Sequence, residues 1–252
     1  MRKILYLVLK EMKIRLKYRF VWVNMALTPF FIIGPYVFSS RIADVNSLTE
    51  RVMIGALLWY WLNQYFFGVG DGFTEEREEG ALISVVLAPV SLLTFLFSKS
   101  IDTFIMNLYI TFFTLLFFNL SGVKLEFHLL FLLLLVVSGV YITFFSIFFA
   151  ALSLWKKKIR SINSTVQFFF GILSGMVNPV ENFPIYVRFV SYMIPLTYLI
   201  SMGRRLIKGD TNGFVFQLLI LTTLSVAYLI LGIWLLRKAE NEIRRKGEWE
   251  TW

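Results

Sequence analysis

The feature that most constrains this chain is the grouping of its apolar residues into blocks of about twenty. As a helix, each block is long enough to cross the ~30 Å hydrocarbon core of a bilayer. Hydrophobic residues make up 58% of the 252 residues, whereas a soluble domain is nearer ~45–50%. The sequence therefore predicts an all-α polytopic membrane protein forming one transmembrane domain over 1–252. Its six transmembrane helices are expected at about 20–38, 52–70, 97–119, 129–152, 164–180 and 214–236.

The segment 1–19 predicts an amphipathic helix lying in the plane of the membrane surface. Its apolar residues recur at helical spacing on one face, and its lysines lie on the opposite face: Ile4, Leu5, Val8, Leu9, Met12 and Leu16 against Lys3, Lys10, Lys13 and Lys17. That pattern suits an anionic membrane surface. The alternative is a solvated helix before the first span.

The segment 176–204 is mostly apolar, but it cannot be one straight helix. It contains Pro179, Pro184 and Pro195 together with the charged residues Glu181 and Arg188. Proline inside a helix removes a backbone hydrogen bond and clashes with the preceding turn. We therefore expect short re-entrant helices between spans five and six, packed against protein rather than lipid.

The distribution of positive charge predicts the orientation. With six spans and a cytoplasmic N-terminus, 17 of the 25 lysines and arginines fall in inside segments and seven in outside segments. Cytoplasmic loops of membrane proteins carry an excess of these residues. We expect a multi-pass protein of the cytoplasmic membrane with both termini inside, and with segment 176–204 on the extracellular side.

Several kinds of chemistry are missing from the sequence. There is no cysteine, and His128 is the only histidine, so thiolate catalysis and a multi-histidine metal site are excluded. No GxxxxGK[ST] motif is present, so the chain has no phosphate-binding P-loop of its own. We expect no catalytic residue, no metal site and no bound cofactor, and nothing in the sequence indicates a nucleic acid partner. If the protein uses ATP and Mg, another chain binds them.

Polar residues inside spans need partners. Lys99 and Asp102 are three residues apart on span three, so they can form an intramembrane pair on one helix face. A proton or ion relay is the alternative, although it usually needs acids on several spans. Four amides in the spans either line a polar path or form interhelical hydrogen bonds: Asn63, Gln64, Asn107 and Gln167.

An acidic cluster interrupts the loop 71–89, which the charge distribution places in the cytoplasm. It consists of Glu75, Glu76, Arg77, Glu78 and Glu79, followed by Gly80. Four of the 16 acids of the chain lie in these five residues. One interpretation is a contact with basic groups of a partner protein. The other is a solvated helix start, where acids favour the positive end of the helix dipole.

Two stretches resemble the ABC-2 type transporter permeases. The first is TEEREEGALISVVLAPVSLLTFLFSKSID, residues 74–102, with a glutamate-rich turn, a glycine, a short apolar helix, a proline and an early lysine in span three. The second is SGMVNPVENFPIYVRFVSYMIPLTYLISMGRR, residues 174–205, which is similar to the late extracellular segment of the family. The family commonly has threonine where this chain has Ala81.

The resemblance covers essentially the whole chain and implies a function. It implies that the chain is the transmembrane subunit of an ABC exporter for a drug, lipid or glycolipid. Its expected partners are a cytoplasmic ABC ATPase subunit, a second permease subunit and the lipids of the membrane. The loop 71–89 would supply the coupling helix, and segment 176–204 would close the outer end of the pathway, with Pro179, Pro184, Pro195, Thr197 and Tyr198 as candidate gate residues. An ion- or proton-coupled secondary transporter and a polysaccharide-exporting ABC permease remain alternatives.

Overall fold

The computed structural model describes residues 2–42, 46–120, 122, 129–155 and 160–246. Over these residues the chain is helical and contains no strand. The longer helices are α1 Arg2–Lys17, α2 Arg19–Ile42, α3 Asn46–Tyr65, α6 Leu92–Leu120, α7 Leu129–Trp155, α8 Arg160–Leu173, α10 Pro195–Ile207 and α11 Phe214–Lys246. The shorter ones are the π-helix η1 Phe66–Gly70, α4 Gly72–Glu78, α5 Leu82–Leu87, the 3-10 turn η2 Val180–Asn182 and α9 Ile185–Ser191.

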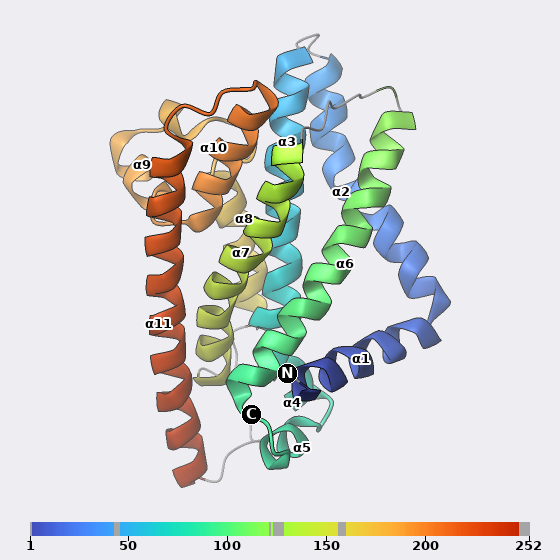
Figure 1. The fold of residues 1–252 in the computed structure, drawn as a ribbon, viewed down its shortest axis with the longest axis vertical. Coiled ribbons are helices and arrows are strands. Elements are labelled where there is room, and N and C mark those ends of the chain that lie inside the picture. Colours follow the sequence, from blue (N-terminus) through green and yellow to red (C-terminus); the bar gives the residue numbers. More distant parts are fainter. Residues whose placement is uncertain (1, 43–45, 121, 123–128, 156–159, 247–252) are drawn as a thin grey trace.

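Helix α3 forms the centre of the molecule. Every residue from 52 to 63 is buried, because α2, α6, α7, α8 and α10 all pack against α3 (Figure 1). Helix α11 lies outside this core and packs along α7. The burial of α3 therefore follows from the helices that pack around it.

Glycines allow α8 and the turn that follows it to approach α3 closely. A Cβ atom at Gly171 of α8 would lie 2.5 Å from the Trp59 ring, and one at Gly55 would lie 2.1 Å from the carbonyl oxygen of Met176. The indole of Trp59 also donates a hydrogen bond to the Gln167 carbonyl (3.1 Å). Helix α8 therefore packs closely against α3 at Gly171 and Trp59.

Four of the six expected spans are confirmed as helices long and apolar enough to cross a membrane. They are Phe20–Ser39, Leu92–Leu120, Leu130–Trp155 and Phe214–Arg245. Within the described part of the chain, the expected spans 52–70 and 164–180 do not meet that test. The first contains polar and amphipathic residues such as Asn63 and continues beyond Tyr65 as a π-helix. The second ends at Leu173, before a turn with positive φ (81°) at Gly175.

The segment 176–204 is broken by its prolines, as the sequence predicted. Pro179 precedes η2, Pro184 precedes α9 and Pro195 begins α10, positions where a missing N–H is tolerated. Helices α9 and α10 meet at 93°. Such a pair is either a broken span or a re-entrant loop, and taken as one span it would raise the number of candidates to five.

The two ends of the molecule differ in structure. Helix α1 lies across one end and packs on α6, and α4, α5 and the last turns of α11 lie at the same end (Figure 1). Helix α10 and the first turns of α3 lie at the opposite end. Val8 of α1 is buried, whereas Leu5, Leu9 and Leu16 are exposed. Only part of the predicted apolar face therefore packs on protein, and the rest is available to lipid.

Candidate functional site

The acidic cluster of the sequence forms α4 and the turn after it. Gly80 has φ 68°. Its N–H donates a hydrogen bond to the Arg77 carbonyl (3.1 Å), and the N–H of Ala81 donates one to the Glu76 carbonyl (2.8 Å). This pair of hydrogen bonds is the Schellman motif, which requires a left-handed residue just past the helix end. Glycine therefore ends α4 and reverses the chain into α5.

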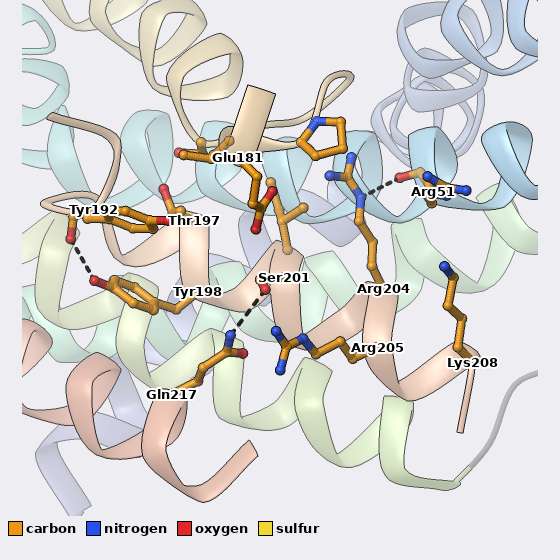
Figure 2. A pocket seen from close by; sticks show the side chains of 14 residues that line it. Arg51, Glu181, Tyr192, Thr197, Tyr198, Ser201, Arg204, Arg205, Lys208 and Gln217 are labelled. Atoms are coloured by element: carbon orange, nitrogen blue, oxygen red, sulfur yellow. Dashed lines mark hydrogen bonds between the residues drawn. The ribbon is translucent and has the colours of Figure 1, made fainter. Parts of the chain in front are cut away.

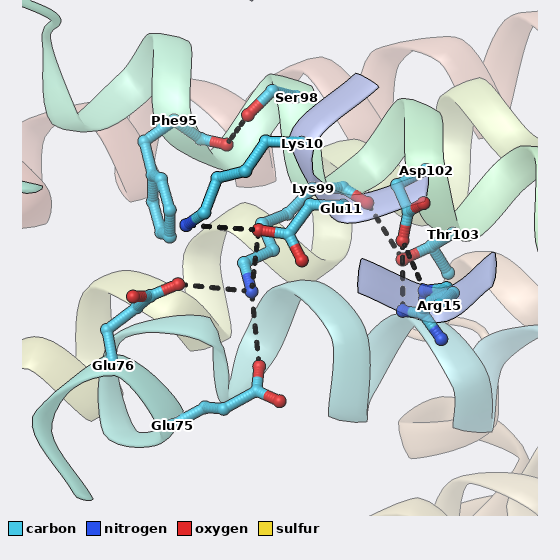
Figure 3. A network of polar contacts seen from close by, with 10 residues as sticks. All are labelled: Lys10, Glu11, Arg15, Glu75, Glu76, Phe95, Ser98, Lys99, Asp102 and Thr103. Carbon is cyan, nitrogen blue, oxygen red and sulfur yellow. Dashed lines mark hydrogen bonds and ion pairs between the residues drawn. The ribbon is translucent and has the colours of Figure 1, made fainter. Parts of the chain in front are cut away.

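An ion-pair hub centred on Lys99 joins three helices at this end of the molecule (Figure 3). The ammonium group of Lys99 on α6 lies 3.2 Å from a carboxylate oxygen of Glu75 and 3.2 Å from one of Glu76, both on α4. It also lies 3.6 Å from a carboxylate oxygen of Glu11 on α1. Three carboxylates therefore surround one ammonium, and α1, α4 and α6 are held together.

A second ion pair lies one turn further along α6. The guanidinium of Arg15 donates to the same oxygen of Asp102 from Nη2 (2.9 Å) and from Nε (3.2 Å). Glu11 and Arg15 are four residues apart on α1, and Lys99 and Asp102 are three apart on α6, so the two helices present opposite charges in register.

These contacts correct the prediction that Lys99 and Asp102 neutralise each other within span three. Each pairs instead with other helices: Lys99 with α1 and α4, and Asp102 with α1. The physical reason is burial. Both side chains are almost fully buried, so each needs a close partner of opposite charge, and the neighbouring helices bring such partners nearer.

The glutamates of the cluster divide into two groups. Glu75 and Glu76 bind Lys99 within the chain, and Glu76 is buried. Glu78 and Glu79 are exposed. Arg77 is also buried, and this burial lowers the pKa of its guanidinium from the usual value. Of the four glutamates considered for a partner contact, Glu76 has its side chain inside the protein.

An exposed surface is presented by the turn and by α5, and we refer to it as the α4–α5 tip. It consists of Glu78, Glu79, Gly80, Ile83, Ser84 and Leu87, all exposed. Leu87 is 78% exposed and Ile83 40%, whereas Leu82 on the inner face is fully buried. Two carboxylates therefore lie beside two exposed aliphatic side chains on this surface.

The α4–α5 tip is fixed to the rest of the molecule from behind. Phe73 of α4 stacks on Phe95 of α6 with ring centroids 5.7 Å apart, and Lys99 lies over the Phe95 ring. Lys3 at the start of α1 donates a hydrogen bond to the Pro89 carbonyl just after α5. These contacts tie the tip to α1 and α6.

A match to a protein family shows what kind of protein this is. The sequence model of the ABC-2 family transporter proteins matches residues 22–234. The chain belongs to the ABC-2 transporter family. It is a membrane permease of an ABC transporter, and the family implies association with an ABC ATPase subunit. Among proteins of curated function, no sequence match is found.

In this ABC-2 permease the other predicted site residues fall into two groups. Pro179, Thr197 and Tyr198 line a polar cavity at the end of the molecule opposite the ion-pair hub (Figure 2). The hydroxyl of Thr197 donates to the Ser191 carbonyl (2.6 Å) and that of Tyr198 to the Tyr192 carbonyl (3.0 Å), so both residues join α10 to α9. Pro184 and Pro195 set the ends of these helices.

The four amides of the permease spans come from three helices, with Gln64 next to Asn63 on α3. Asn63 is on α3, Asn107 on α6 and Gln167 on α8, and all three are buried. Among the described residues, neither polar atom of the Asn107 side chain has a hydrogen-bond partner. The α3–α6 contact instead uses the Trp61 indole, which donates to the Thr111 hydroxyl (2.8 Å). Whether the amides line a pathway stays a prediction.

Sequence reasoning missed two residues of the hub, Glu11 and Arg15. It treated α1 as a lipid-facing helix with an apolar and a lysine face, and Glu11 and Arg15 belonged to neither. The available signal was the pair of charges inside span three, since Lys99 and Asp102 needed partners. Glu11 and Arg15 on α1 are these partners: Glu11 pairs with Lys99, and Arg15 pairs with Asp102.

Proposed function

We propose that this chain is the permease subunit of an ABC exporter, driven by ATP hydrolysis on a separate cytoplasmic subunit. It would move a hydrophobic or amphipathic substrate, such as a drug, lipid or glycolipid, out of the cytoplasm or the inner leaflet. ATP and Mg would be bound by the partner. The observation that carries the proposal is the α4–α5 tip, an exposed acidic and aliphatic surface anchored through Lys99 to α1 and α6.

The geometry supplies a route from the tip to the centre of the permease. Helix α4 follows the π-helix η1, which follows the central helix α3 with no intervening loop. Phe66 of η1 packs among Phe145, Phe149 and Phe170, and the Ser153 hydroxyl donates to the Gly70 carbonyl (2.9 Å). Movement of docked ATPase subunits would displace α4, and η1 would pass this displacement to α3 and α7.

The proposed topology has six spans, with α3 and α8 counted in addition to the four that are apolar enough. α1 would lie in the cytoplasmic membrane surface, and α9 and α10 would form the re-entrant region on the outer side. Support comes from Figure 1, in which α1, α4, α5 and the end of α11 lie at one end of the molecule. The basic loop 156–158, which was used to predict the orientation, lies outside the described residues.

A second permease subunit is part of the proposal, as a homodimer or a heterodimer. Two of the four helices that qualify as spans are largely exposed within this chain: only 22% of the qualifying window of Phe214–Arg245 and 28% of that of Phe20–Ser39 is buried. Their apolar surfaces are available to lipids or to the second subunit.

The ion-pair hub argues against proton-coupled transport. The acid of span three, Asp102, is held by Arg15 at the edge of the helix bundle, and a relay would need further acids deeper in the spans. A proton relay through the spans therefore has little support, and we prefer the proposal that transport is driven by ATP.

The experiment is co-purification. The tagged permease, expressed with the ATPase encoded nearest to it, should retain a chain that contains GxxxxGK[ST], and the complex in liposomes should hydrolyse ATP. Failure of every such ATPase to co-purify with a folded permease would overturn the proposal. Collapse of the proton gradient should leave transport intact while ATP lasts.

A further inference from the structure

A cavity at the end of the permease opposite the ion-pair hub is unusually rich in positive charge. Its volume is about 340 Å³, and it lies between α3, α10, α11 and the turn η2. Four cationic side chains line it: Arg51 from α3, and Arg204, Arg205 and Lys208 from α10. Figure 2 shows Arg51 and Arg204 on one side of α10 and Arg205 beside Gln217 on the other.

Glu181 is the one carboxylate among the described residues that line this cavity. Two further acids, Glu50 beside Arg51 and Asp210 near Lys208 in the sequence, do not line the cavity. Among the described residues, four positively charged side chains and one carboxylate therefore line the cavity. On the proposed topology these four are more than half of the seven outside lysines and arginines, although cations generally favour the cytoplasmic side. Their convergence on one cavity indicates a specific task.

The arginines are held in place by neutral acceptors. Arg204 donates to the carbonyl oxygens of Met176 (2.7 Å) and Arg51 (3.1 Å). Arg205 donates to the Asn212 carbonyl (2.9 Å). A carbonyl group orients a guanidinium but does not cancel its charge. The positive charges are therefore fixed in position before any ligand arrives, which lowers the entropic cost of binding an anion.

An unsatisfied polar group at the cavity is an independent sign of a ligand. Ser174 lines the cavity and is 1% exposed, and its hydroxyl has no hydrogen-bond partner among the described residues. Buried hydroxyl groups in proteins normally have a hydrogen-bond partner, so a buried hydroxyl without one needs an explanation. Nearby, the Gln217 amide donates to the Ser201 hydroxyl (3.3 Å). The site thus offers hydroxyl donors alongside the cations.

We propose that this cavity binds a phosphate-class anion through Arg204, Arg205 and Lys208, with the Ser174 hydroxyl as a further donor. Planar guanidinium groups and an ammonium match the several oxygens of a phosphate. Either inorganic phosphate or the headgroup of an anionic phospholipid supplies this chemistry. The neighbouring α9 exposes Ile185, Tyr186 and Phe189, an apolar surface on which acyl chains could lie.

The test uses the full chain purified in detergent and titrated with inorganic phosphate, with short-chain phosphatidylglycerol and with short-chain phosphatidylcholine. Lys208→Glu reverses an exposed charge that makes no described side-chain bond, so folding should be retained. It should weaken binding by about tenfold or more, the scale of losing a charge-assisted hydrogen bond and adding repulsion. Lys13→Glu, the same change on the exposed side of α1, is the matched control and should leave phosphate affinity unchanged. Ser174→Ala should weaken binding severalfold.

Each outcome decides the matter. Saturable phosphate binding that Lys208→Glu weakens and Lys13→Glu does not assigns a phosphate site, and binding of phosphatidylglycerol alone assigns a lipid headgroup site. Absence of saturable binding of all three probes, or equal effects of the two lysine variants, would overturn the proposal. No ATPase is present in the measurement, so its failure is separate from failure of the proposed function.

Discussion

Arg15 of the first helix and Asp102 of α6 form an ion pair of 2.9 Å, with the carboxylate almost fully buried. The contact joins residues 87 positions apart and fixes α1 to α6, one of the candidate spans. A double-mutant cycle with Arg15→Gln and Asp102→Asn should therefore give a coupling energy of about 1–3 kcal/mol. The measurement is unfolding in detergent, followed by tryptophan fluorescence.

The control for this prediction is the pair within one helix. A cycle with Lys99→Gln and Asp102→Asn should give a smaller coupling, below about 0.5 kcal/mol, because the two side chains use different partners. A larger coupling for Lys99 with Asp102 than for Arg15 with Asp102 would contradict the assignment of partners.

Lys99 should be essential for stability through the charges around it. Lys99→Met leaves the buried carboxylate of Glu76 without its cation, and removing one member of a buried pair costs about 3–5 kcal/mol. Lys99→Arg should lose much less. The double variant Lys99→Met with Glu76→Gln should recover part of the loss, since the uncompensated charge is then gone. Thermal unfolding of the three variants checks this, and no recovery would argue against the hub.

Gly80 should contribute to stability only through its left-handed backbone conformation. A Cβ atom there would meet nothing within 4 Å, but φ is +68°, so Gly80→Ala should cost about 1–2 kcal/mol through left-handed strain. Gly80→Asn should cost less, because asparagine tolerates this region. Equal stability of the alanine variant and the original chain would rule out the left-handed turn.

Gly55 should be the least replaceable of the helix glycines of α2 and α3. Gly55→Ala places a methyl group against the Met176 carbonyl, which accepts a hydrogen bond from Arg204. Overpacking of this kind costs about 1–3 kcal/mol, and the lost hydrogen bond adds to it. Gly34→Ala is the matched control, since its Cβ would make only ordinary contact with Phe38. Unfolding measurements should therefore separate the two variants.

The sequence predicted well what hydropathy and proline chemistry determine. Four spans follow from apolar length, and the breaks near Pro179, Pro184 and Pro195 follow from the geometry of proline. It could not predict that α3 occupies the centre, because burial on every side depends on how the other helices pack. The end of α8 before Gly175 was missed for a local reason, a left-handed glycine inside an apolar stretch.

The candidate site was predicted in part for similar reasons. Charge and composition singled out the segment 75–80, and the family match supports its place in an ABC-2 permease. The division between buried Glu76 and exposed Glu79 depends on the position of Lys99, which lies 20 residues or more away in sequence. The partners Glu11 and Arg15 could be inferred only by asking where the span charges find opposite charges.

The most direct test of the account is the affinity of the permease for its ATPase subunit when the α4–α5 tip is altered. Glu79→Arg and Leu87→Asp change exposed side chains, so folding should persist while the affinity falls by about tenfold or more and transport-coupled ATPase activity is lost. Asp210→Arg, the same charge reversal at the other end of the molecule, should leave the affinity unchanged. Unaltered affinity and normal substrate-stimulated ATPase activity in both tip variants would contradict the account.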